Sequence, residues 1–99
     1  MGAEDQTDLD EAALSELSKK ALARIREGLG TIPDQDLREY VDTFSKKREI
    51  LSKVIRRPKD HTEVQLMKDR AELRDRLNLI LGSIDGELAR RRRIQSWNF

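Results

Sequence analysis

Apolar residues at helical spacing run through residues 60–88, and this pattern constrains the fold more than any other feature. Leucines and isoleucines recur there every three, four or seven residues: Leu66, Leu73, Leu77, Ile80, Ile84 and Leu88. An α-helix has about 3.6 residues per turn, so this spacing aligns the side chains along one side of a helix. Such a stripe must pack against a partner. It therefore predicts a helical bundle.

Two earlier segments show the same periodicity, and we expect helices over residues 8–28 and 34–56. Their apolar stripes are Leu14, Leu17, Ala21, Leu22 and Ile25 in the first, and Leu37, Val41, Phe44, Leu51 and Ile55 in the second. Asp8 can cap the first helix, and Gly28 or Gly30 can end it in a left-handed conformation. Thr31 or Asp34 can cap the second helix, and Pro58 cannot lie inside it.

A third helix is expected over residues 60–89. Asp60 and Glu63 have the spacing of a capping box, in which each side chain accepts a hydrogen bond from the other end of the first turn. Gly82 and Gly86 interrupt the stripe, and each glycine costs a helix interior about 1 kcal/mol relative to alanine. Two outcomes stay open: a bend at residues 82–86 or a straight continuation.

The predicted fold class is all-α. We expect a three-helix antiparallel, coiled-coil-like bundle over residues 8–89, a polar N-terminal tail over 1–7 and a basic helical arm over 90–99. Only 36% of the residues are hydrophobic and 39% are charged, which indicates a thin core and favours elongated helices or an oligomer.

Composition also bears on the class of protein. There is no cysteine, which excludes disulfides and thiolate chemistry. The one histidine, His61, falls at a helix start away from any cluster of carboxylates, so we expect no catalytic residues, no metal and no cofactor. No apolar run is long enough for a membrane span or a signal peptide, which predicts a cytoplasmic protein, or one inside a viral particle.

Four consecutive arginines followed by two aromatic residues form the strongest candidate site. A run of four surrounds a helix on all sides, so we expect an acidic partner to meet it. Trp97 and Phe99 either fold back over the end of the bundle or insert into a partner's pocket. The predicted partner-binding residues are Arg90, Arg91, Arg92, Arg93, Trp97 and Phe99.

A second basic set lies in and after the middle helix, and it could follow a phosphate backbone: Lys46, Lys47, Lys53, Arg56, Arg57 and Lys59. Acidic residues interrupt this set, so an ordinary solvated face is the simpler interpretation. Residues 1–18 carry six acidic and no basic side chains, while the whole chain has a net charge of +1. This distribution counts against nucleic acid and favours protein partners or neighbouring copies.

These patterns predict a non-catalytic interaction protein, such as an adaptor or a small component of a multi-subunit assembly, that docks through residues 90–99. The alternative is a helical nucleic-acid-binding protein that uses the arginines and the second basic set. A structural or assembly component of a phage or virion is a further alternative.

Overall fold

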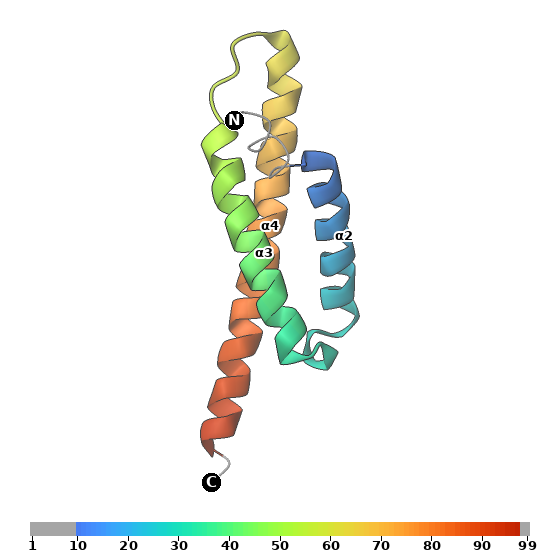
Figure 1. The fold of residues 1–99 in the computed structure, drawn as a ribbon, viewed down its shortest axis with the longest axis vertical. Coiled ribbons are helices and arrows are strands. Elements are labelled where there is room, and N and C mark those ends of the chain that lie inside the picture. Colours follow the sequence, from blue (N-terminus) through green and yellow to red (C-terminus); the bar gives the residue numbers. More distant parts are fainter. Residues whose placement is uncertain (1–9, 98–99) are drawn as a thin grey trace.

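Between residues 10 and 97 the chain forms three α-helices and one short 3-10 turn. The computed structural model describes residues 10–97. The elements are α2 (Glu11–Gly28), the turn η1 (Leu29–Thr31), α3 (Asp34–Val54) and α4 (His61–Trp97). Figure 1 shows that the chain reverses direction at η1 and again in the link before α4. No β-strand occurs between residues 10 and 97, and the predicted all-α class is confirmed.

The longest helix, α4, is the shared partner of the other two. It packs against α3 and against α2, whereas α2 and α3 approach each other closely at few points. At 1.5 Å per residue its 37 residues span about 55 Å, compared with about 27 Å for α2 and about 32 Å for α3. Helix α4 therefore extends past its neighbours.

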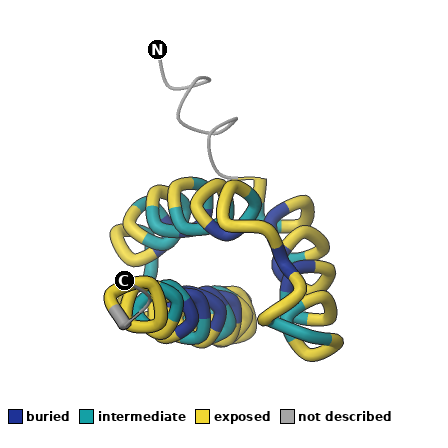
Figure 2. The backbone as a smooth tube through the Cα atoms, turned by 90° about the horizontal axis from the view of Figure 1, so that it is seen from below, coloured by how far each residue is buried: buried dark blue, intermediate teal, exposed yellow. Residues whose placement is uncertain are grey.

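The core lies where the stripes of the three helices meet. Phe44, Leu51, Leu77, Ile80 and Ile84 are fully buried at its centre. Seen along the helices, the buried residues face the interior that the three elements share (Figure 2). The periodicity of α3 and α4 therefore identifies the core correctly over most of its length.

The prediction that Leu17 and Leu66 belong to the core is wrong, because Leu17 is 43% exposed and Leu66 is 38% exposed. On α2 the buried position belongs to Ser18 instead. Its hydroxyl donates to the Ser15 carbonyl oxygen at 2.8 Å and accepts from Arg76 Nη1 at 3.2 Å. A hydroxyl that is satisfied in this way can be buried without the cost of an unpaired polar group.

The two ends of α2 differ from prediction in their chemistry. Asp10 is the N-cap, and its Oδ1 accepts from the Ala13 amide at 3.1 Å. The predicted cap Asp8 lies outside the described residues. At the other end, Gly28 does end the helix, but none of the described glycines has a left-handed backbone. The chain tightens into η1 instead, and the Thr31 hydroxyl donates to the Gly28 carbonyl at 2.7 Å.

Helix α3 begins without a side-chain cap. Pro33 occupies the N-cap position, so the predicted capping roles of Thr31 and Asp34 are wrong. Asp34 is the first helical residue, and its carboxylate binds an arginine of α4 instead.

The link from α3 to α4 is held by a group of hydrogen bonds around Glu63. Asp60 caps α4 as predicted, since its Oδ1 accepts from the amides of Thr62 at 3.0 Å and Glu63 at 3.1 Å. Glu63 accepts from the Lys59 amide at 2.8 Å and binds both terminal nitrogens of Arg56 at 2.9 and 2.8 Å. These contacts, the Arg56 pair first, lower the pKa of the Glu63 carboxyl to about 2.

Helix α4 passes through Gly82 and Gly86 without interruption, which decides between the two predicted outcomes in favour of a continuous helix. A Cβ atom at either glycine would meet nothing within 4 Å. In the part of the chain that the structure describes, no helix has the length and apolar character needed to cross a membrane.

Candidate functional site

The last three turns of α4 carry the candidate site, and they begin at a buried carboxylate. Glu87 is only 7% exposed although it is charged. Arg90 Nε and Nη2 donate to its two oxygens at 2.9 and 2.7 Å, and Arg91 Nε donates at 2.7 Å. Residues three and four apart lie on the same side of a helix, so these three side chains are neighbours by their spacing alone.

Charge-assisted hydrogen bonds dominate the electrostatics of this group. The guanidinium of Arg90, and then that of Arg91, lower the pKa of the Glu87 carboxyl to about 2. In return, Glu87 raises the pKa of Arg90, and Asp34 and Glu87 raise that of Arg91. The carboxylate therefore stays ionised at any physiological pH and holds both arginines against α4.

Arg91 connects α4 to the turn between α2 and α3. Its Nη2 donates to the carbonyl oxygens of Ile32 at 2.7 Å and Leu29 at 3.3 Å, and its Nη1 binds the Asp34 carboxylate. The side chain is only 18% exposed. A helix end and the turn that follows it leave carbonyl groups without helical partners, and a planar guanidinium can satisfy several of them together.

The four predicted arginines consequently do not form one uniform set. Arg90 and Arg91 have acidic partners within the chain. The sequence pattern, by contrast, suggests an external partner for all four arginines. Arg92 and Arg93 are exposed, and neither has a hydrogen-bond or ion-pair partner in the described structure. The unsatisfied charge of the run is therefore confined to its second half.

Beyond Arg91 the described side chains of α4 are largely open to solvent. Residues 92–96, which we call the exposed end of α4, are all exposed, and Ile94 is 45% exposed. The exposed end projects past η1 in Figure 1. Of the two predicted aromatic anchors, Phe99 and the side chain of Trp97 lie outside the described part of the structure.

Two members of the second basic set have acidic partners within the chain. Lys46 binds Asp42 at 3.2 Å, and Arg56 is held by Glu63. The other members are spread over the second half of α3 and the link: Lys47, Lys53, Arg57 and Lys59. Arg38, by contrast, is a basic residue that the sequence pattern does not single out, and it lies near the exposed end of α4.

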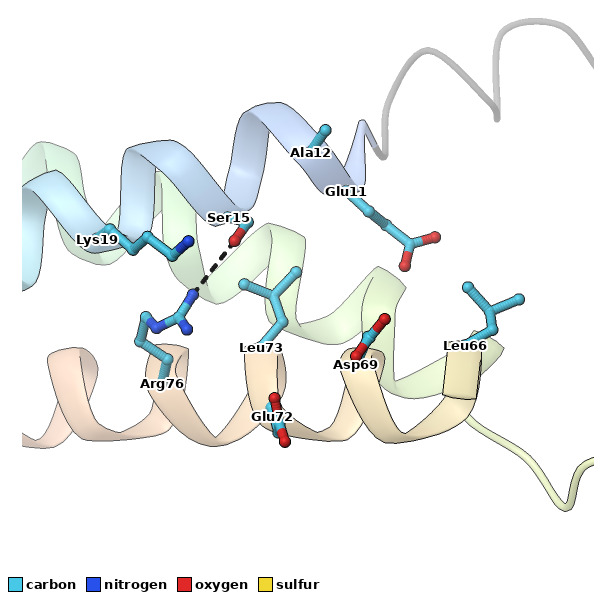
Figure 3. A pocket seen from close by; sticks show the side chains of 9 residues that line it. All are labelled: Glu11, Ala12, Ser15, Lys19, Leu66, Asp69, Glu72, Leu73 and Arg76. Carbon is cyan, nitrogen blue, oxygen red and sulfur yellow. Dashed lines mark hydrogen bonds between the residues drawn. The ribbon is translucent and has the colours of Figure 1, made fainter. Parts of the chain in front are cut away.

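A hollow of about 500 Å³ lies between α2 and the first half of α4. Figure 3 shows Arg76 reaching from α4 to Ser15 of α2, with Glu11 and Asp69 at the opposite side of the hollow. Glu11 binds Arg70 Nε at 3.1 Å, and Asp69 accepts from Gln65 at 2.9 Å. The bonds of Glu11 and Arg76 thus join the two helices, whereas Asp69 is paired within α4.

Metal-binding geometry is not found: within residues 10–97, no three histidine or acidic side chains are grouped so that they could hold an ion. His61 is exposed at the first residue of α4. Comparison of the chain with models of protein families, with curated proteins and with solved structures gives no match.

Proposed function

We propose that this chain is a non-catalytic interaction protein, an adaptor or small component of a multi-subunit assembly. In this proposal the helices form an antiparallel, coiled-coil-like bundle that presents the exposed end of α4 as a basic helical arm to an acidic protein partner. One observation supports the proposal above others. Arg92, Arg93 and Ile94 are exposed at the end of α4, and neither arginine has a charge partner in the described structure.

The energetics favour an external partner for this segment. An exposed isoleucine gains about 1.5 to 3 kcal/mol when it is fully buried, and arginine is among the residues that dominate interface energies. Arg91 supports the surface indirectly, because its bond to Asp34 joins α4 to the start of α3. Glu87 binds the same guanidinium from within α4. The arm thus leaves the bundle at a defined position.

A continuous phosphate-binding surface has less support. Lys46 is already paired, and Lys53 lies about 22 Å along α3 from Arg38, at the opposite end of that helix from the exposed end of α4. A nucleic acid would therefore meet two separated basic regions rather than one track.

The test is partner recovery with the full chain carrying an N-terminal affinity tag. We expect Arg92→Glu together with Arg93→Glu to abolish recovery of the partner from the source cells. The matched control is Lys20→Glu with Arg26→Glu, which makes the same charge change at two exposed, unpartnered positions of α2. Equal recovery by the wild type and the arm variant, or equal loss in the control, would refute the proposal.

Deletion variants should end after Arg91 rather than before it. A truncation that removes Arg90 and Arg91 also removes the bonds to Glu87, Asp34 and the η1 carbonyls, so it would confuse loss of binding with loss of folding.

A further inference from the structure

A pocket of about 240 Å³ lies beside the arm, where the first turns of α3 meet the last turns of α4. Five of its six lining side chains are charged or polar, and Leu88 gives it one apolar wall: Asp34, Arg38, Leu88, Arg91, Arg92 and Gln95. The pocket therefore combines positive charge with an apolar surface.

Its donors divide into those already used and those free to bind a ligand. Arg91 donates to Glu87, to Asp34 and to the Ile32 carbonyl oxygen. Its bond to Asp34 also occupies that carboxylate. Arg38 and Arg92 are exposed, and in the described structure neither has a hydrogen-bond or ion-pair partner. Gln95 is likewise exposed, and its amide is free.

The two free guanidiniums come from different helices, and both helices are held in place by the Arg91 contacts. Guanidinium groups bind planar oxyanions through paired N–H donors, and prepositioned donors lose less conformational freedom on binding. An oxyanion between Arg38 and Arg92 would replace water on two charges that have no other partner.

Carboxylate suits the pocket better than a nucleic-acid backbone. The next basic residues of α3, Lys46 and Lys47, are at least about 12 Å further along the helix. A single acidic side chain with a methylene stem can instead contact Leu88 and reach the guanidiniums.

We propose that this pocket binds a carboxylate side chain from an acidic segment of the partner protein, with Arg38 and Arg92 as its charged donors and Gln95 as a neutral one. The inference rests on the proposed function and names the chemistry that the partner must present. It also extends the binding surface from the arm onto α3, through Arg38.

Binding of a labelled hexaglutamate peptide to the full chain, followed by fluorescence anisotropy at low salt, tests the site. Hexaglutamine, inorganic phosphate and a single-stranded oligonucleotide serve as competitors. The variants are Arg38→Gln and Arg92→Gln, and the matched control is Arg26→Gln. Arg26 is exposed on α2, has no partner in the described structure and does not line the pocket.

We expect each pocket variant to weaken peptide binding about fivefold and the control less than about twofold, since a partly exposed ion pair contributes up to about 1 kcal/mol. Hexaglutamine should not compete. Arg38 and Arg92 have no partner among the described residues, so both variants should keep the wild-type melting temperature. If Arg38→Gln melts lower than the wild type, Arg38→Lys is used in its place. We expect Arg38→Lys to lose affinity for the peptide although it retains the positive charge.

Several results would overturn the site. Equal weakening in all three glutamine variants would show general attraction, and an unchanged Arg38→Gln variant would remove α3 from the surface. Absence of peptide binding at millimolar concentration, or stronger competition by phosphate or the oligonucleotide, would also reject a carboxylate site. Partner recovery that depends on Arg92 and Arg93 but not on Arg38 would reject the pocket and leave the proposed function standing.

Discussion

Replacement of Glu87 by glutamine should destabilise the fold in a way that depends on pH. Glu87 is buried and accepts three charge-assisted hydrogen bonds, from Arg90 and Arg91. Glutamine keeps the shape but removes the charge and brings an amide N–H₂ group toward two cations. The substitution therefore removes the electrostatic attraction without creating a cavity.

The magnitude follows from the displaced pKa. A shift of the Glu87 carboxyl from 4.5 to about 2 corresponds to a ceiling of about 3 kcal/mol. The Arg90 side chain is 53% exposed, so solvent screens part of this interaction. We expect a loss of about 1 to 2 kcal/mol in the free energy of unfolding at pH 7, or about 4 to 16 °C in melting temperature.

The sign of the pH dependence is fixed because the folded-state pKa is lowered. The stabilisation is fully present above pH 4.5, where the unfolded chain is also ionised, and it is lost as the pH falls through 2. At pH 3 less than about half of the difference between wild type and Glu87→Gln should remain.

Urea unfolding followed by far-UV circular dichroism at pH 7 and pH 3 measures both quantities. Asp85→Asn is the matched control, because Asp85 lies on the same helix, is exposed and has no partner in the described structure. A Glu87→Gln variant as stable as the wild type at pH 7, or a difference that is the same at both pH values, would refute the reasoning.

Three further predictions concern stability. Gly82→Ala should raise the stability of α4 by about 1 kcal/mol in a thermal melt, since the new methyl meets nothing within 4 Å; a lower melting temperature would contradict the open surface seen there. Leu77→Ala should cost about 2 to 5 kcal/mol in urea unfolding, because Leu77 is fully buried, and a cost below 1 kcal/mol would show that the core collapses around it. Glu63→Gln should melt below the wild type above pH 4.5, with a difference that disappears as the pH falls through about 2; a difference that persists in acid would exclude the Arg56 pair as its cause.

Local signals in the sequence predicted the elements well where a single residue decides the backbone. Asp60 and Pro58 mark the link between α3 and α4, and the predicted start of α3 at Asp34 agrees with the structure. The sequence did not decide whether α4 bends at residues 82–86 or continues straight. The free-energy cost of two glycines in a helix is comparable to the free energy gained when the helix packs. Ile84, fully buried between them, adds contacts that keep the helix continuous.

The candidate site was only partly predictable. The bonds from Glu87 to Arg90 and Arg91 follow from helical spacing, so the i,i+3 and i,i+4 rule could have identified them. The bond from Arg91 to Asp34 joins residues 57 positions apart, and no local pattern encodes it. Arg38 belongs to the pocket only because α3 starts beside the end of α4. Such pairings depend on how the helices pack.

The position of α4 as the shared partner determines when the protein can fold during its synthesis. Helices in proteins draw most of their stability from the packing of an apolar face, and α2 and α3 have few close approaches to each other. Both helices are synthesised before α4, so their apolar residues cannot be buried until α4 is present. The bond between Asp34 and Arg91 then closes the connection between α2 and α3 over α4. We therefore expect this core to form only once α4 has been synthesised, rather than helix by helix.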